Sequence, residues 1–433
     1  MREQILHDLA NVYPVSPEQE ARSLNVPAID VLLEVFMLKA MGPGAEHRQP
    51  HPPSPEQRAA QEQNRLAEEM LFRGEEETAP ATEPISPSNV FFSDSAYRSK
   101  RPCPVVEISS NLSGAGKTEL LYYLVALSIL PRAIGEIPVD GQNAAVVFID
   151  ADDRFDAERL RTIARAIVRK SYGSMDREGS GEESDVSADD IEAILLSALK
   201  HVHVFRPESS SALLATLESL DEYLYDISRH YSASRPLQMI AIDSATAFIW
   251  LDRLRDEIAR TEDIGRPQAE IERERELKLS FFVSDLYAEL VKQLKRLQSR
   301  FGSAVVFTST VPEARPAKNS TEYTGPPGPF DQPSSRTPAL RPALPAPWGT
   351  FPILRLVVQR DTVWPFPPTM SAHDARSEAS MRQSVVLQGK FSAWVNAWGR
   401  EEWPRRVVDG ISYTGGSFPF YVKASGVEIP LPE

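Results

Sequence analysis

Residues 111–118 read NLSGAGKT, and apolar runs frame this glycine-rich turn on both sides. The run before it, residues 105–108, is typical of a strand, and residues 119–130 (ELLYYLVALSIL) are typical of a buried helix. A strand, a glycine-rich turn, Gly-Lys-Thr and a helix follow one another in the order of a phosphate-binding loop. The sequence therefore predicts a site for the phosphates of a nucleotide.

Each residue type in this turn suits that chemistry. Gly114 and Gly116 have no Cβ, so the backbone N–H groups can approach a phosphate closely. The N-terminus of the following helix favours negative charge, and the Lys117 ammonium can reach the outer phosphates. The Thr118 hydroxyl can ligate Mg²⁺. The residues predicted to contact the nucleotide are Asn111, Ser113, Gly114, Ala115, Gly116, Lys117 and Thr118.

One position departs from the usual GxxxxGK[ST] pattern, because Asn111 replaces the first glycine. Asparagine is among the few other residues that adopt left-handed backbone conformations, so the turn can survive the change. The alternative is a chance glycine-rich turn before a helix.

Further apolar runs at residues 144–150 (AAVVFID), 237–243 (LQMIAID) and 303–310 (SAVVFTST) alternate with helical patterns. Together they predict a doubly wound, mostly parallel α/β sheet. Strand-like runs near the C-terminus without long helices between them predict an antiparallel edge. Asp243 ends one of the central strands, where a carboxylate can hold Mg²⁺ beside a phosphate loop.

Composition narrows the class of protein. The 433 residues carry 61 acidic and 47 basic side chains, a net charge of −14, which argues against a surface that coats nucleic acid throughout. The single cysteine, Cys103, excludes a disulfide framework and fits a reducing compartment. The start MREQILHDLA lacks a signal peptide's apolar segment, and the longest apolar run is too short to span a bilayer. We therefore expect an intracellular protein with no membrane segment.

The composition also changes along the chain. Residues 1–100 are predicted to be a variable, partly disordered region with one apolar helix that begins near Pro27. Residues 101–433 are predicted to be the core, interrupted by flexible inserts at about 172–190, 311–350 and 365–382.

Two other sets of residues are candidates for chemistry. The pair His201 and His203 could ligand a metal, but no third ligand follows at a diagnostic spacing, and both can simply share one face of a strand. The tryptophans near the C-terminus are expected to be core anchors or a partner patch, namely Trp394, Trp398 and Trp403.

Four phrases in order, NLSGAGKTELLYYL, VVFIDADDRFDAERL, IAIDSATAFIWLDR and AVVFTST, resemble the RecA/RadA-like recombinases, and most of all their short eukaryotic paralogues. The resemblance covers about residues 104–310 and the last strand. It implies a RecA-like P-loop NTPase core, with ATP and Mg²⁺ as cofactors. It further implies a nuclear role in homologous recombination, in a hetero-oligomer with other recombinase paralogues, the D-type paralogue foremost, that assists the main recombinase on single-stranded or branched DNA.

The same resemblance assigns roles to particular residues. Asp152 stands where the family has its catalytic glutamate, and Thr310 stands where it has a glutamine that senses the γ-phosphate. Both side chains are shorter, so the resemblance implies ATP binding with weak hydrolysis or none. Arg159 falls at the position of a base-stacking arginine.

The resemblance also makes residues 250–265 and 311–350 DNA-facing loops. In the first, Arg253, Arg255 and Arg260 could contact phosphates, or could equally form ion pairs with nearby acids.

Two other functions fit a phosphate loop. One is an independent phosphotransferase such as a small-molecule kinase, although residues 311–350 have few arginines for a catalytic lid. The other is an interaction subunit whose phosphate loop is a relic.

Overall fold

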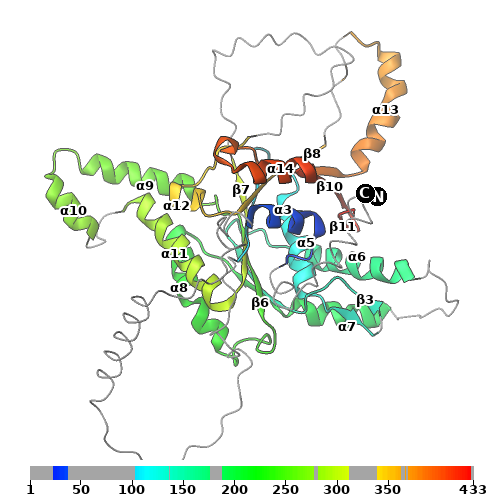
Figure 1. Ribbon diagram of the computed structural model, residues 1–433, viewed down its shortest axis with the longest axis horizontal. Coiled ribbons are helices and arrows are strands. Elements are labelled where there is room, and N and C mark those ends of the chain that lie inside the picture. The colour runs from blue at the N-terminus through cyan, green and yellow to red at the C-terminus, as the bar shows by residue number, and fades with distance from the viewer. Residues whose placement is uncertain are drawn as a thin grey trace, which may run out of the picture. The chain divides into compact units, whose positions relative to one another are not determined.

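The computed structural model describes residues 23–37, 103–135, 137–175, 188–276, 281–311, 339–361, 366 and 369–430. Its centre is a nine-stranded sheet in the order β11-β10-β9-β8-β1-β7-β6-β4-β5 (Figure 1). The strands are β1 (Val105–Ser110), β4 (Ala145–Asp150), β5 (Val202–Phe205), β6 (Leu237–Asp243), β7 (Ala304–Thr310), β8 (Leu354–Arg360), β9 (Lys390–Val395), β10 (Ser417–Lys423) and β11 (Gly426–Glu428). A separate hairpin pairs β2 (Ala133–Ile134) with β3 (Ile137–Pro138).

The direction of the strands confirms the predicted fold class. All pairs from β5 through β4, β6, β7 and β1 to β8 are parallel. The pairs β8–β9, β9–β10 and β10–β11 are antiparallel and form one edge. β1, β4 and β6 are buried along their whole length, because helices cover both faces of the sheet. The sheet is therefore the predicted mostly parallel α/β sheet with an antiparallel edge.

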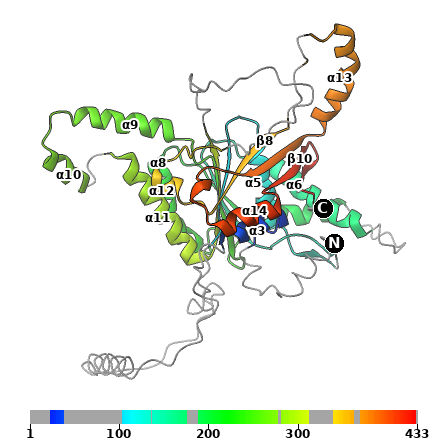
Figure 2. The same cartoon turned by 45° about the horizontal axis from the view of Figure 1, so that its top comes forward.

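Two apolar cores lie on opposite faces of the sheet (Figures 1 and 2). The first core includes α3 (Pro27–Met37), α5 (Lys117–Ile129), α6 (Ala157–Met175) and α7 (Ala188–Leu199). The second includes α8 (Ser210–Tyr225), α9 (Ile249–Glu262), α11 (Val283–Phe301) and α12 (Ala346–Gly349). The other helical elements are α10 (Gln268–Glu276), α13 (Ala372–Leu387), η3 (Arg400–Glu402) and α14 (Arg405–Thr414).

The helix predicted near Pro27 is α3, and it belongs to the core. Ile29, Leu32 and Leu33 are buried in the first apolar cluster. The Asp30 carboxylate holds the helix start, since it accepts hydrogen bonds from the Leu24 N–H at 2.8 Å and the Val26 N–H at 2.9 Å. α3 therefore packs in the core although it precedes residue 100, where the core was predicted to begin. Residues 38–102 lie outside the described residues.

The inserts predicted from composition are shorter in the structure. α6 continues to Met175 and α7 begins at Ala188, so only residues 176–187 of the first insert lie outside the described residues. At the end of the second insert, Leu344 and Trp348 are buried in the second core, where apolar contact outweighs the local proline content. Residues 312–338 lie outside the described residues.

The third insert, predicted at 365–382, contains α13, and residues 383–387, one of the strand-like runs near the C-terminus, belong to the same helix. The Ser371 hydroxyl caps the helix by accepting a hydrogen bond from the Asp374 N–H at 3.1 Å. The sequence after this cap is rich in residues that favour helices, which explains why helix formation prevails there. The strand that follows is β9.

Candidate nucleotide-binding site

The turn between β1 and α5 depends on its second glycine. Gly116 has a φ of 90°, in the left-handed region. A Cβ on Gly116 would lie 2.9 Å from the Phe391 ring and 3.1 Å from the Phe420 ring. These rings come from β9 and β10 and stack with a centroid distance of 5.3 Å. The rings of the antiparallel strands thus lie against the turn, and a larger residue at position 116 would need both a strained backbone and a shift of these rings.

Gly114 differs from Gly116, because its surroundings are open. Its φ is 71°, and an added Cβ would meet no atom within 4 Å. Open space beside a left-handed backbone is what a loop needs if its N–H groups are to surround a phosphate. Asn111, Ser113 and Ala115 lie in the same turn between β1 and α5.

The Lys117 ammonium lies within this turn. Lys117 Nζ donates to the Ser110 hydroxyl at 2.7 Å and to the Leu112 carbonyl oxygen at 3.3 Å. Partial burial lowers the pKa of Lys117, while the nearby carboxylates of Asp243 and Asp152 oppose that shift. The Lys117 ammonium in this turn therefore interacts electrostatically with the Asp243 and Asp152 carboxylates.

Asp243 joins three elements at the carboxyl edge of the parallel strands. Thr118, in the first turn of α5, donates its hydroxyl to Asp243 Oδ2 at 2.8 Å. Thr308, on β7, donates its hydroxyl to Asp243 Oδ1. Thr118 was predicted from its motif, whereas Thr308 was not, because its position opposite Asp243 depends on the pairing of β6 with β7.

These oxygens are suited to a hard cation. Mg²⁺ in nucleotide sites is held by one or two protein oxygens together with phosphate oxygens and water. The Asp243 carboxylate and the Thr118 hydroxyl supply such oxygens, and the open turn at Gly114 supplies room for phosphate. The residues present therefore fit ATP with Mg²⁺.

Asp152 lies beside this site. The Ala151 and Asp152 N–H groups donate to the Asp243 carbonyl oxygen at 2.8 and 3.4 Å. These bonds attach the turn after β4 to the end of β6. The Asp152 side chain is exposed at the surface. The pKa of the Asp152 carboxyl is raised, mainly because the carboxylate is partly shielded from water and secondly because Asp243 repels its negative charge.

Thr310 ends β7 at the same edge, and its side chain is exposed. Its N–H donates to the Thr246 hydroxyl at 3.0 Å. The structure thus brings Lys117, Thr118, Asp152 and Asp243 together, with Thr310 at the same edge of the sheet.

Arg159 has partners that its sequence position does not predict. Its guanidinium donates to the Glu119 carboxylate, with Nη2 and Oε2 separated by 2.8 Å. It also donates to the carbonyl oxygens of Lys423 at 2.9 Å and Ala424 at 3.0 Å. Arg159 therefore connects α6 to α5 and to the turn between β10 and β11. Stacking on a base would have to use the flat face of this bonded guanidinium.

The histidine pair belongs to a closed hydrogen-bond cluster. The Ser232 hydroxyl lies 2.9 Å from His201 Nδ1 and 2.9 Å from His203 Nε2. His203 Nδ1 lies 3.0 Å from the Tyr223 hydroxyl, and His230 accepts from the Ser232 N–H at 3.1 Å. Burial lowers the pKa of His201 and of His203 to about 4. The described residues include no group of three side chains placed to hold a metal ion.

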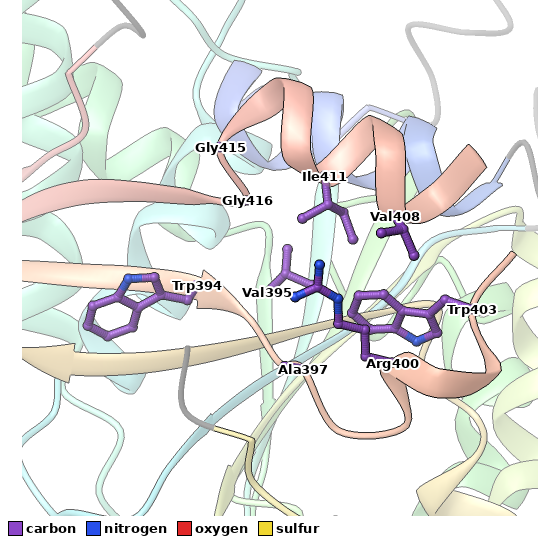
Figure 3. Close-up of a pocket in the computed structure, with 9 residues that line it drawn as sticks. All are labelled: Trp394, Val395, Ala397, Arg400, Trp403, Val408, Ile411, Gly415 and Gly416. Carbon is purple, nitrogen blue, oxygen red and sulfur yellow. The ribbon is translucent and has the colours of Figure 1, made fainter. Parts of the chain in front are cut away.

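A small pocket near the C-terminus involves two of the predicted tryptophans (Figure 3). It lies between the end of β9 and α14, and Arg400 and Trp403 form one wall. Its volume of about 60 Å³ is well below the several hundred that a cofactor needs. Trp403 packs edge-on against Phe36 of α3 at 5.4 Å, which makes it a core anchor, whereas Trp398 is exposed.

The segment predicted as a DNA-facing loop at 250–265 is mainly helix α9. Two of its arginines have partners within the chain. Arg253 donates to the Ala343 carbonyl oxygen at 2.9 Å, and Arg260 pairs with Asp256 at 2.8 Å. Ion pairing of the kind anticipated therefore holds for Arg260, and contact with DNA stays a prediction.

Among the helices that the structure describes, none combines the length and the apolar character that crossing a bilayer requires.

Comparison with known proteins finds several DNA repair and recombination proteins that are similar to this chain. No protein-family model matches the chain. "DNA repair protein XRCC2" of Mus musculus is 34% identical over 142 residues, which are 33% of this chain and 40% of that protein. "DNA repair and recombination protein RadA" of Haloquadratum walsbyi is 25% identical over 214 residues, 49% of this chain and 52% of that protein. "DNA repair protein XRCC2 homolog" of Arabidopsis thaliana is 25% identical over 272 residues, 59% of this chain and 68% of that protein. The chain thus matches about half the length of the first two relatives.

Proposed function

We propose that this chain, a RecA/RadA-like recombinase paralogue at modest identity to its relatives, binds ATP with Mg²⁺ and acts in DNA repair by homologous recombination. The kinship is the one that the four sequence phrases predicted, and the relatives are named for DNA repair or recombination. The observation that carries the proposal is the convergence of Lys117, Thr118 and Asp243 at one edge of the sheet.

Each residue has a task in this proposal. The turn at Gly114 and Gly116 surrounds the phosphates with N–H groups, and Lys117 offers them a mobile positive charge. Thr118 and Asp243 hold Mg²⁺, which when bound would neutralise phosphate charge. Thr308 fixes the rotation of the Asp243 carboxylate. Arg159 fixes α6 against the first turn of α5 through Glu119, and the resemblance gives it the further role of stacking on the base.

Hydrolysis by this chain alone is expected to be slow. A general base must come within hydrogen-bond reach of the attacking water. Asp152 is one methylene shorter than the glutamate of the recombinases, and Thr310 is shorter than their glutamine. We infer a nucleotide-stabilised assembly subunit rather than a motor.

The partners are proposed from the same kinship. They are other recombinase paralogues, the D-type paralogue foremost, in a nuclear hetero-oligomer that assists a recombinase on single-stranded or branched DNA. Copurification from DNA-damaged cells, with wild type against Lys117→Ala, tests this point. Loss of the paralogue in the variant supports a nucleotide-dependent complex, and an unchanged complex favours a relic phosphate loop.

The direct test of the site is a titration with a fluorescent ATP analogue in the presence of Mg²⁺. Lys117→Ala should weaken binding by about 100-fold, because a charge-assisted contact to phosphate is lost in a partly buried site. Lys292→Ala is the matched control, since Lys292 lies exposed on α11 and pairs with Glu289. Equal affinity of wild type and Lys117→Ala would remove nucleotide binding from the proposal.

A turnover assay separates the assembly subunit from a motor that hydrolyses ATP. We expect the isolated chain to hydrolyse ATP slowly, and Asp152→Ala to change that rate little. Brisk turnover that Asp152→Ala abolishes would show that Asp152 is an efficient base.

A further inference from the structure

The turn after α8 exposes aromatic and apolar side chains at one end of the sheet. Tyr225, Ile227 and Tyr231 are 41%, 61% and 77% exposed. The turn leads into the amino end of β6, and α7 and α11 lead into the amino ends of β5 and β7. Because the phosphate loop lies at the carboxyl ends of the parallel strands, these side chains form a separate region. They also lie outside residues 250–265 and 311–350, the segments predicted to face DNA.

Two tyrosine rings in this region each lie under a basic side chain. Lys200 Nζ is 5.6 Å from the centroid of the Tyr231 ring, and the Arg229 guanidinium carbon is 5.3 Å from the centroid of the Tyr223 ring. Lys200 and Arg229 are both exposed. Within the part of the chain that the structure describes, no carboxylate lies within ion-pair distance of either cation. Both charges therefore remain available for an anion.

The end of α8 is joined to the end of α11. Arg300 of α11 pairs with Asp221 of α8, and its guanidinium carbon lies 5.5 Å from the centroid of the Tyr225 ring. The Tyr225 ring also packs against Phe301, with a centroid distance of 5.7 Å. Since α8 and α11 lie side by side (Figure 1), these contacts extend the aromatic and basic region from the turn onto α11.

The backbone on both sides of Tyr231 is held by hydrogen bonds. His230 donates from Nε2 to the Leu224 carbonyl oxygen at 3.1 Å, and the Ser232 hydroxyl lies 2.9 Å from His201 Nδ1. The exposed Tyr231 ring therefore projects from a turn whose neighbouring residues are fixed to the protein. An aromatic ring presented in this way loses little conformational entropy when it binds a partner.

The charge at this end of the sheet differs from that of the whole chain. Residues 200, 221–236 and 296–302 carry five basic and three acidic side chains, whereas the net charge of the chain is −14. Two of the three acids have local partners, because Asp221 pairs with Arg300 and the Asp226 carboxylate accepts from the Ser228 N–H at 3.1 Å. The third, Glu222, is exposed. The region thus favours an anionic partner within an acidic protein.

We propose that the surface formed by Lys200, Tyr225, Arg229 and Tyr231 binds single-stranded DNA. Proteins that bind single strands without sequence preference combine aromatic rings, on which bases stack, with cations that contact the phosphates. Here the exposed Tyr231 ring takes a base, and Lys200 and Arg229 take neighbouring phosphates. The bases of a duplex are already stacked on one another, so the surface should prefer a single strand. This surface goes beyond the proposed nucleotide site and the predicted loops, and only the choice of DNA over RNA rests on the proposed function.

The first test is fluorescence anisotropy of the full chain with a labelled oligothymidine of about 20 nucleotides. Tyr231→Ala should weaken binding about tenfold, because the stacking of one base is lost. Tyr413→Ala is the matched control, since Tyr413 on α14 is 71% exposed, and it should bind as wild type. The absence of binding by wild type would overturn the proposal, as would equal affinity of wild type and Tyr231→Ala.

The second test is the salt dependence of the same binding. Lys200→Ala and Arg229→Ala should each weaken binding and reduce the slope of log affinity against log salt by about 0.7, because each removes one phosphate contact. Lys292→Ala, at an exposed lysine on α11, should leave the slope unchanged. Glu222→Gln should strengthen binding, since it removes an acid beside the strand. Unchanged slopes in both Lys200→Ala and Arg229→Ala would contradict the proposal.

The third test separates DNA from other anionic partners. A glutamate-rich peptide of the same net charge should bind about tenfold more weakly than the oligonucleotide, because it has no bases to stack. If the peptide bound as tightly and lost as much affinity in Tyr231→Ala, the surface would belong to a protein partner and the proposal would fail. Tighter binding of RNA of matching sequence would also overturn the choice of DNA.

Titration of Tyr231→Ala with the ATP analogue keeps this proposal distinct from the nucleotide site. We expect unchanged affinity for the analogue, because Tyr231 and the phosphate loop lie at opposite ends of the strands. Loss of DNA binding together with loss of analogue binding would mean that the substitution disturbs the fold, and would remove Tyr231 as support for the surface.

Discussion

The phosphate-loop edge and the histidine cluster are both groups of titratable side chains beside parallel strands, yet they differ in free hydrogen-bonding capacity. In the cluster, Ser232 serves His201 and His203, and Tyr223 serves the remaining nitrogen of His203. At the phosphate-loop edge, Lys117 lies over an open turn and Asp152 is exposed.

This difference separates stability from binding. Polar groups that satisfy one another in the interior hold the chain in one conformation and leave little for a ligand. The carboxylate oxygens of Asp243 accept hydrogen bonds from the hydroxyl groups of Thr118 and Thr308, which can rotate to accept or donate. The closed cluster should therefore govern stability, and the open edge should govern ligand affinity.

The largest expected effect is the loss of stability on acidification. Burial lowers the pKa of His201 and His203 to about 4, against about 6.5 in the unfolded chain. Between these values the unfolded chain binds protons that the folded chain does not. Stability contributed by the cluster is thus complete above pH 6.5 and is lost as the pH falls toward 4. We expect a loss of roughly 2 kcal/mol per histidine at pH 4.5, measured by urea unfolding.

Comparison with His203→Gln isolates this effect, because the carboxylates titrate alike in both proteins. The variant should show a smaller loss between pH 7 and pH 4.5, by about 2 kcal/mol. An identical pH dependence in the two proteins would mean that folding does not lower the pKa of His203, which would contradict this account of the cluster.

The second effect concerns the hydroxyl at the centre of the cluster. Ser232 is 2% exposed, and Ser232→Ala leaves one nitrogen on each of two buried histidines without its partner. We expect the free energy of unfolding to fall by about 2 kcal/mol, with unchanged affinity for the ATP analogue. Ser228→Ala, at an exposed serine nearby, should cost far less. Weakened nucleotide binding in Ser232→Ala would contradict the separation of the two regions.

Most of the sheet could be predicted from sequence because its signals are local. Continuous apolar runs ending in Asp150 and Asp243 specify buried parallel strands, and residues 111–118 carry a contiguous motif. Once the carboxyl ends of parallel strands meet at one edge, Thr118 and Asp243 must lie close together. The mutual hydrogen bond of these two residues therefore follows from patterns that are each only a few residues long.

The remaining features depend on contacts between distant segments. Arg159 donates to the Lys423 carbonyl oxygen, 264 residues away in the sequence. Gly116 lies against Phe391 and Phe420, which belong to the distant antiparallel strands β9 and β10. Asp252 of α9 is buried because it accepts a hydrogen bond from the Tyr287 hydroxyl on α11, 35 residues later. Composition predicts a flexible insert at residues 365–382, but a serine cap starts α13 within that segment.

The third effect tests the open edge. Thr308→Val keeps the shape of the side chain and removes the hydroxyl that holds Asp243 Oδ1. We expect affinity for the ATP analogue with Mg²⁺ to fall about tenfold, because the carboxylate loses its fixed orientation. Without Mg²⁺, affinity should be unchanged, and Thr350→Val, at an exposed threonine, serves as the control. An equal loss with and without Mg²⁺ would show that Thr308 acts through the fold and not through the metal.

The smallest effect is expected at Arg206, which lies at the carboxyl end of β5, between the two regions. Arg206 Nε lies 3.1 Å from Asp150 and 3.2 Å from Asp153, but its side chain is 55% exposed, so water screens both pairs. Asp150 is buried and also accepts the N–H groups of Arg154 at 2.9 Å and Phe155 at 3.0 Å. These backbone bonds, and not the ion pair, should hold the turn that carries Asp152.

Arg206→Ala should therefore lower the free energy of unfolding by about 0.5 kcal/mol or less, and Asp150→Ala by about 2 kcal/mol. Urea unfolding of both variants against wild type makes the comparison. If Arg206→Ala cost as much as Asp150→Ala, the charge of Arg206 would be organising the turn. The phosphate-loop edge would then depend on Arg206, which follows β5, the strand that carries His203. The two regions could no longer be treated as independent.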